Sequence, residues 1–104
     1  MEDVATSRNG AHIRLSDERW AHIVVRHPEM IPLRDEVLLT IGRPDLIQAG
    51  DIGTLLAVRW LPTTPLTSKF CVVVYRETSA DDGFVVTAYL TRRLATTRSV
   101  VWTR

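Results

Sequence analysis

The 104-residue sequence has one cysteine, Cys71, and therefore cannot form a disulfide within the chain. Small secreted domains usually depend on several disulfides, so that class is excluded and a reducing compartment is favoured. No apolar run approaches the roughly 20 residues that a membrane-spanning helix needs. The acidic start, Met1-Glu2-Asp3, lacks the positive region that opens a signal peptide. We therefore expect a soluble, cytoplasmic protein without a membrane partner.

Lysine is scarce, and so are acidic residues in the C-terminal quarter. Lys69 is the only lysine among 13 basic residues, and no acid follows Asp82. The end of the chain holds four arginines and no acid, a local charge of +4, although the whole chain carries only +1. Arginine suits paired contacts with phosphate, which favours a nucleic-acid partner. A GC-rich genome would equally explain the preference for arginine over lysine. A solvated tail would equally explain the basic C-terminal quarter.

The length and the ordinary globular composition, 45% hydrophobic and 24% charged, predict one domain over residues 1–104. We expect residues 1–11 to be a loose lead-in. The core is expected to span about residues 12–93, and residues 94–104 to form a basic C-terminal segment.

Two helices are predicted in the N-terminal half. Ser16 is suited to cap the first, because its hydroxyl can accept a hydrogen bond from a free backbone N–H. Pro28 disfavours helical geometry at His27 and ends that helix. The second helix is expected to begin around Pro32, to carry an apolar stripe and to end at Gly42.

Strand patterns dominate the rest of the chain. The clearest is a hairpin in which a strand at 69–77 turns at 79–83 and returns at 84–91. Further strands are expected at 12–15, 54–60 and 100–102. An N-terminal pair of helices that leads into an antiparallel sheet defines an α+β fold.

One flank of the first predicted helix carries Arg19, His22 and Arg26 beside its apolar face. An arginine four residues after a histidine lies close to it on a helix, and its charge disfavours imidazolium. His22 would then act as a general base or acid beside an arginine that binds phosphate. A solvated helix flank explains the same residues.

The remaining reactive side chains are better explained by structural roles than by catalysis or metal binding. His27 falls in the middle of the apolar face of the first helix, which favours a core or capping role. Two histidines five residues apart chelate a metal poorly on one helix, and no third histidine is near, so no metal site is expected. No cofactor-binding motif is present. Cys71 lies in a hydrophobic strand and is expected to pack rather than react.

Alternation along the 84–91 strand predicts one apolar face, made of Phe84, Val86, Ala88 and Leu90. The other face carries Thr87, Tyr89 and Thr91 and continues into Arg92. Hydroxyl groups can bind phosphate oxygens, and a tyrosine can stack on a base. A solvent-exposed sheet face, on which threonine and tyrosine are favoured for propensity alone, fits equally well.

Two groups of segments carry a resemblance to known proteins. The first group is LSDERWAHI at 15–23 with RHPE at 26–29, and the second is LAVR at 56–59, Lys69, VVVYRE at 72–77 and GFVVTAYLT at 83–91. In these segments, from about His12 to Arg93, the chain resembles the phage and bacterial relatives of the barnase, EndoU, colicin and RelE-like nucleases.

The resemblance implies one or two N-terminal helices packed on a four-stranded antiparallel sheet, and metal-independent cleavage of RNA. In that chemistry a base takes the 2′-hydroxyl proton, a cation stabilises the pentavalent oxyanion, and an acid protonates the leaving 5′-oxygen. The residues assigned to catalysis are His22, His27, Tyr89 and Thr91. The residues assigned to phosphate binding are Arg26, Arg59, Lys69, Thr87 and Arg92.

The leading hypothesis is therefore an endoribonuclease, with RNA as its substrate, that acts as the toxin of a toxin–antitoxin or mobile-element system. An antitoxin protein would then be a partner. The alternatives are a non-catalytic module that binds nucleic acid or protein through the same face, and a purely structural phage or mobile-element protein. Convergence of His22, Arg26, Tyr89 and Thr91 around one cleft would favour catalysis, because acid, base and clamp must reach one phosphate. A helix flank and a strand face that point apart would favour the binding module.

Overall fold

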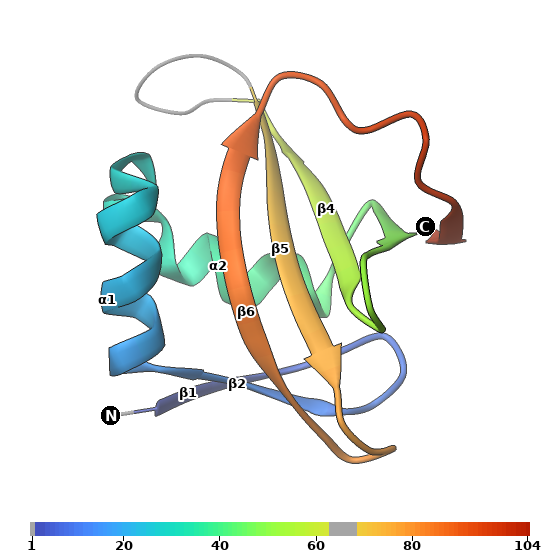
Figure 1. Ribbon diagram of the computed structural model, residues 1–104, viewed down its shortest axis with the longest axis horizontal. Helices are drawn as coiled ribbons and strands as arrows, with labels where there is room; N and C mark the ends of the chain where they lie inside the picture. The colour runs from blue at the N-terminus through green and yellow to red at the C-terminus, as the bar shows by residue number, and fades with distance from the viewer. Residues whose placement is uncertain (1, 63–68) are drawn as a thin grey trace.

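The computed structural model describes residues 2–62 and 69–104. Its described strands form one seven-stranded sheet in the order β1-β2-β6-β5-β4-β3-β7 (Figure 1). In chain order the elements are β1 (Glu2–Thr6), β2 (His12–Ser16), α1 (Asp17–Arg26), the 3-10 helix η1 (Pro28–Leu33), α2 (Arg34–Gly42), β3 (Leu46–Ala49), β4 (Leu55–Leu61), β5 (Lys69–Glu77), β6 (Asp82–Thr91) and β7 (Val100–Thr103).

The α+β class is confirmed, but the expected four-stranded antiparallel sheet is wrong. The sheet has seven strands and is mixed, because β2 and β6 run parallel while the other described neighbours are antiparallel. Parallel neighbours need a long connection, and here it includes both helices and β3 to β5. Strands β1 and β3 were not expected from the sequence.

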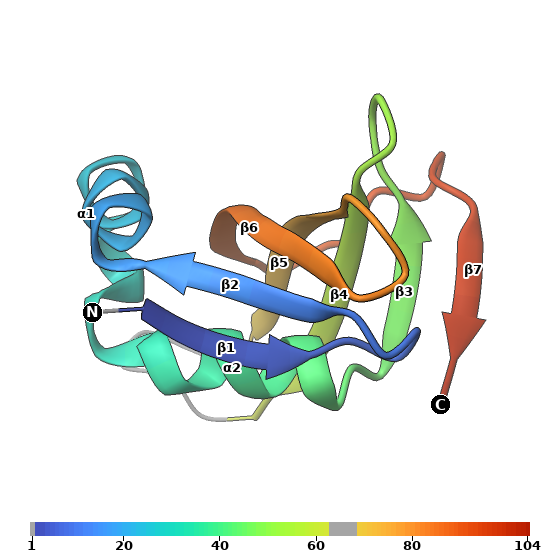
Figure 2. The ribbon, with the colours of Figure 1, turned by 90° about the horizontal axis from the view of Figure 1, so that it is seen from below.

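The start of the chain forms a hairpin rather than the expected loose lead-in. Its turn is closed by hydrogen bonds from the Ser7 N–H to the Ala11 carbonyl, at 2.8 Å, and from the Gly10 N–H to the Ser7 carbonyl, at 2.9 Å. Gly10 has a φ of 89°, which glycine adopts without a steric penalty. The Ser7 hydroxyl also donates to Glu77 at the end of β5. This turn places β1 and β2 side by side, as Figure 2 shows.

Both predicted helices are confirmed, with one changed boundary. The Ser16 hydroxyl caps α1 by accepting from a backbone N–H of the first turn at 3.1 Å. α1 ends, as Pro28 predicts, just before its C-cap residue His27. Pro32 lies inside η1, and α2 begins two residues later than expected. In the described parts of the chain no helix is long and apolar enough to cross a membrane.

The two faces of the sheet are covered differently. α2 lies on one face, behind the sheet in Figure 1, and contacts β1, β4 and β5. The main core lies there and includes Val37 and Ile41 of α2 with Cys71, Val73 and Tyr75 of β5, all fully buried. On the other face a smaller cluster forms around Leu56, Val58 and Val72, against which Tyr89 and Leu94 pack.

A bulge in β6 changes the expected division of its faces. The pairing of β6 with β5 shifts just before Thr87 and leaves Val86 as an extra residue. Val85 is therefore buried in the main core with Ala88, whereas Phe84, expected on the apolar face, is 37% exposed. From Thr87 onward the alternation follows the prediction.

Candidate functional site

The outer edge of β6 is open where α1 lies beside it (Figure 1). β2 pairs with β6 only over residues 82–84, because the chain then turns into α1. α1 packs against β2, β6 and η1 without pairing, so no described strand covers this edge of β6 beyond Phe84. A cleft of about 470 Å³ lies between α1 and β6.

Four predicted site residues line this α1–β6 cleft. His22, Arg26 and His27 come from α1 and its C-cap, Thr87 comes from β6, and Arg19 joins them from the preceding turn of α1. Within residues 2–62 and 69–104 neither arginine has an ion pair, and the cleft lining includes no carboxylate. The α1–β6 cleft therefore offers two unpaired guanidinium groups to an anion.

His27 connects this cleft to the sheet face that α2 leaves uncovered. Its backbone N–H donates to the Ile23 carbonyl at 2.8 Å, so the residue caps α1 while its side chain stays one-third exposed. The imidazole centroid lies 5.7 Å from that of the Tyr89 ring, with the ring planes tilted by 36°. His27 Nδ1 is 3.7 Å from Oε2 of Glu29, so a protonated His27 would have a carboxylate partner.

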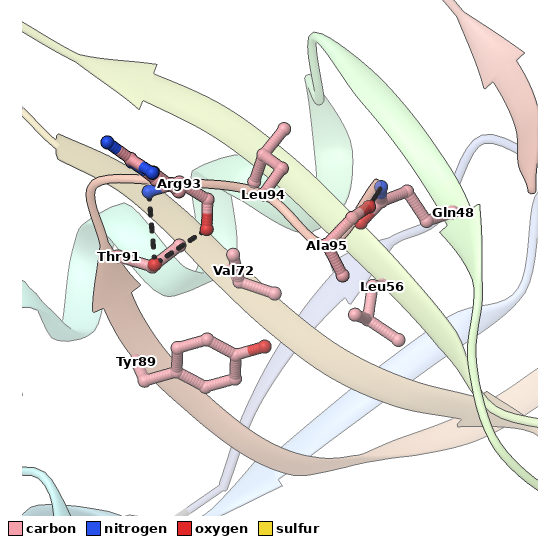
Figure 3. A pocket seen from close by; sticks show the side chains of 8 residues that line it. All are labelled: Gln48, Leu56, Val72, Tyr89, Thr91, Arg93, Leu94 and Ala95. Carbon is pink, nitrogen blue, oxygen red and sulfur yellow. Dashed lines mark hydrogen bonds between the residues drawn. The ribbon is translucent and has the colours of Figure 1, made fainter. Parts of the chain in front are cut away.

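Tyr89 also lines a second pocket, of about 260 Å³, on the sheet face that α2 leaves uncovered (Figure 3). We call it the Tyr89 pocket; its other lining residues are Gln48, Leu56, Val72, Thr91, Arg93, Leu94 and Ala95. The Thr91 hydroxyl donates to the Arg93 carbonyl at 2.8 Å and accepts from the Arg93 N–H at 3.3 Å. Thr91 thus lines the Tyr89 pocket and not the α1–β6 cleft, so only part of the predicted constellation shares one cavity.

The other predicted phosphate contacts lie outside both cavities. Arg59 pairs across the sheet with Cys71, on the face that α2 covers, and donates to a backbone carbonyl just after α2 at 3.4 Å. The sheet therefore separates Arg59 from the face that carries Tyr89. Lys69 is the first residue of β5, and Arg92 is exposed just beyond β6; neither lines the α1–β6 cleft.

The C-terminal charge is partly neutralised within the fold. Arg98 forms an ion pair with Asp51 at 3.1 Å, and Arg104 forms one with Asp45 at 3.4 Å. The hydrogen bond from Arg98 lowers the pKa of the Asp51 carboxyl. Of the four arginines after Asp82, only the two next to β6 lack an ion-pair partner in the described structure. The positive charge of this segment is therefore concentrated beside the Tyr89 pocket.

Three residues of the Tyr89 pocket, Gln48, Leu94 and Ala95, were not singled out from the sequence. Gln48 lies in a strand of only four residues, which is too short to show a period. Leu94 follows β6 in a segment without regular structure. Pro44 and Gly50 bracket β3 and are a local signal for that strand. No local feature of the sequence indicates that Gln48 and Leu94 lie in the same pocket.

Comparison with known proteins does not assign the chain to a family. The chain matches no protein-family model, no curated protein and no solved structure. Among the described residues no group of three or more histidine, cysteine, aspartate or glutamate side chains is placed to hold a metal ion. The α1–β6 cleft and the Tyr89 pocket are therefore the candidate sites for function.

Proposed function

We propose that the protein is a metal-independent endoribonuclease whose reaction takes place in the α1–β6 cleft. The observation that carries this proposal is the grouping of two imidazoles and two unpaired guanidinium groups on one side of the cleft, with Thr87 on the other. Cleavage through the 2′-hydroxyl needs a base, an acid and a cation within reach of one phosphate. The cleft holds all three kinds of group, although they come from His22, His27 and the two arginines and not from the expected set with Tyr89 and Thr91, which line the Tyr89 pocket.

The two histidines divide the proton transfers. We assign His22 as the base that takes the proton of the 2′-hydroxyl while O2′ forms a bond to the adjacent phosphorus. The bond from phosphorus to O5′ then breaks, and protonated His27 gives its proton to that oxygen. The carboxylate of Glu29 lies 3.7 Å from His27 Nδ1, on the ring of the proposed acid. The products are a 2′,3′-cyclic phosphate and a 5′-hydroxyl end.

The arginines stabilise the charge that develops on the phosphate. Arg26 lies one turn after His22 on α1, and Arg19 lies one turn before it, so the two guanidinium groups flank the base. Cations near a forming oxyanion lower the barrier to its formation. Thr87 adds a hydroxyl donor from β6. Tyr89 holds the His27 ring through its aromatic contact, which makes it a positioning residue.

We further propose that the cell restrains this activity with an antitoxin protein, since RNA in the cytoplasm would otherwise be exposed to it. A cleft whose lining has cations and no carboxylate favours a partner that inserts acidic side chains. Such a partner would compete directly with the RNA phosphates for Arg19 and Arg26.

The proposal is tested by incubating the purified chain with total bacterial RNA in EDTA, alongside His22→Gln and His27→Gln. His12→Gln is the matched control, because His12 is exposed on β2 and lines neither cavity. We expect the chain and the His12 variant to cleave RNA and leave cyclic phosphate ends. The two cleft variants should lose about 100-fold or more in rate, as expected for loss of a general acid or base.

Three results would overturn the proposal. Cleavage that stops in EDTA would contradict metal independence. Cleavage that survives both cleft substitutions would place the chemistry elsewhere. Intact RNA that the chain nonetheless retards in a gel would identify the alternative function, a non-catalytic nucleic-acid-binding module.

A further inference from the structure

We infer that the Tyr89 pocket binds a nucleobase of the RNA substrate, one of the two bases that flank the phosphate in the α1–β6 cleft. This inference rests on the proposed function and extends it from cleavage to base selection. Tyr89 joins the two cavities, because its ring contacts His27 and also lines the second pocket (Figure 3).

The pocket has the composition of a site for a flat ring. Tyr89 provides an aromatic wall, and the buried side chains of Leu56 and Val72 lie beside it (Figure 3). Leu94 packs on the same cluster from the segment after β6. Bases stack on tyrosine whatever their sequence, and apolar surroundings strengthen this contact. A volume of about 260 Å³ lies below the usual range of drug-sized sites and suits a single base.

One buried polar group can read the edge of that base. Gln48 is only 5% exposed, and its Nε2 donates to the Ala95 carbonyl at 2.9 Å. This bond fixes the amide and leaves Oε1 with no hydrogen-bond partner among the described residues. A side-chain amide oxygen accepts from the amino or imino N–H of a base. Gln48 thus gives an otherwise apolar pocket a means to discriminate between bases.

The wall formed by the segment after β6 is held in place at both ends. At one end the Thr91 hydroxyl makes two hydrogen bonds to the backbone of Arg93. At the other end Gln48 holds the carbonyl of Ala95. A pocket whose walls are fixed before binding loses little entropy when a base enters.

The two cavities are spaced for one nucleotide. Thr87 lines the α1–β6 cleft, and Tyr89 lines the Tyr89 pocket two residues further along the same face of β6. Two residues of a strand span about 7 Å. Because only a sugar separates the phosphate of a nucleotide from its base, one nucleotide can place its phosphate beside Thr87 and its base beside Tyr89.

The first test fills the pocket and measures base discrimination in short RNA substrates. Each substrate carries either a normal base or an abasic ribose at one of the positions flanking the cut. We expect the unmodified chain to cleave the base-bearing substrate at least about tenfold faster at one position. Ala95→Trp should reduce this ratio to near one. Thr96→Trp is the control, because Thr96 is exposed and does not line the pocket.

A second variant separates reading of the base from stacking. Gln48→Leu keeps the approximate size of the side chain and removes the amide oxygen. We expect it to flatten the preference among the four bases while the ratio of base-bearing to abasic cleavage persists. Thermal unfolding of each variant checks that a changed ratio does not come from loss of the fold.

Binding distinguishes failure of this inference from failure of the proposed function. An RNA with a 2′-deoxy residue at the cut cannot react, and its titration should shift the NMR signals of Leu94, Ala95 and the Gln48 side-chain amide. Cleavage with a ratio near one, together with shifts confined to α1, would overturn the base site and leave the nuclease proposal standing. Shifts in the pocket without any cleavage would overturn the nuclease proposal and leave the base site standing. Neither cleavage nor shifts would overturn both.

Discussion

The two faces of β5 look alike in sequence but have different surroundings. Cys71, Val73 and Tyr75 face α2 and are fully buried in the main core. On the opposite face Val72 is buried too, but beneath Tyr89 and a segment without regular structure, and a pocket remains there. A helix covers a sheet face with close-packed side chains, whereas an irregular segment leaves space between its contacts. The first face therefore stabilises the fold, and the second keeps a cavity for a ligand.

The largest expected effect comes from truncating side chains on the two faces. Ile41→Ala removes a fully buried side chain of α2 and should lower the free energy of unfolding by about 2–5 kcal/mol. Leu94→Ala, on the face with the pocket, should cost less than about 1 kcal/mol, because Leu94 is only partly buried. Urea denaturation measures both values. Equal losses would contradict the comparison.

Alkaline pH should also act through the α2-covered face. Burial raises the pKa of Cys71 from its ordinary 9.0 to about 11, and burial with the nearby Glu77 charge raises that of Tyr75 from 10.0 to about 12. Well below pH 9 both groups are protonated in the folded and the unfolded chain. As the pH rises from about 9 to 12, the unfolded chain loses these protons first, so stability falls.

The size of this alkaline effect follows from the shift of the cysteine. Raising the pKa of Cys71 from 9.0 to about 11 corresponds to about 3 kcal/mol of stability. Unfolding by urea across pH 7 to 11 measures the decline, and Cys71→Ala should make the decline shallower. A slope that this substitution leaves unchanged would show that other groups cause the alkaline instability.

The smallest effect is expected at the Tyr75 hydroxyl. This hydroxyl oxygen is buried without a hydrogen-bond partner among the described residues. Because an unpaired buried hydroxyl is unfavourable, Tyr75→Phe should leave stability unchanged or raise it by about 1 kcal/mol. Tyr89→Phe makes the same change on the opposite face of the sheet, where the ring is only partly buried, and serves as the comparison. A loss of more than about 1 kcal/mol at Tyr75 would contradict the unpaired state of its hydroxyl.

Local sequence signals predicted the parts of the site that lie on single elements. Ser16 and Pro28 place the ends of α1, and helical spacing puts Arg19, His22 and Arg26 on one flank, where they line the cleft. These features depend on contacts within four residues, which any helix imposes.

The tertiary structure places other predicted residues away from the cleft. Arg59 was expected near the phosphate, but strand alternation puts it on the α2 side of the sheet. Thr91 was expected beside the histidines, yet its hydroxyl is held by the turn after β6. The bulge at Val86 could not be read from alternation, since a single extra residue is invisible in a periodic pattern.

The sequence by itself determined the α+β class, the two helices and the β5–β6 hairpin, because propensity, capping and short turns act over a few residues. It also determined which side chains of α1 share a flank. Only the tertiary structure decided that β1 and β3 complete a seven-stranded mixed sheet, and that Gln48 meets Ala95 beside Tyr89. The bond between Gln48 and Ala95 joins residues 47 positions apart, and its free energy depends on burial and a hydrogen bond that no local window contains.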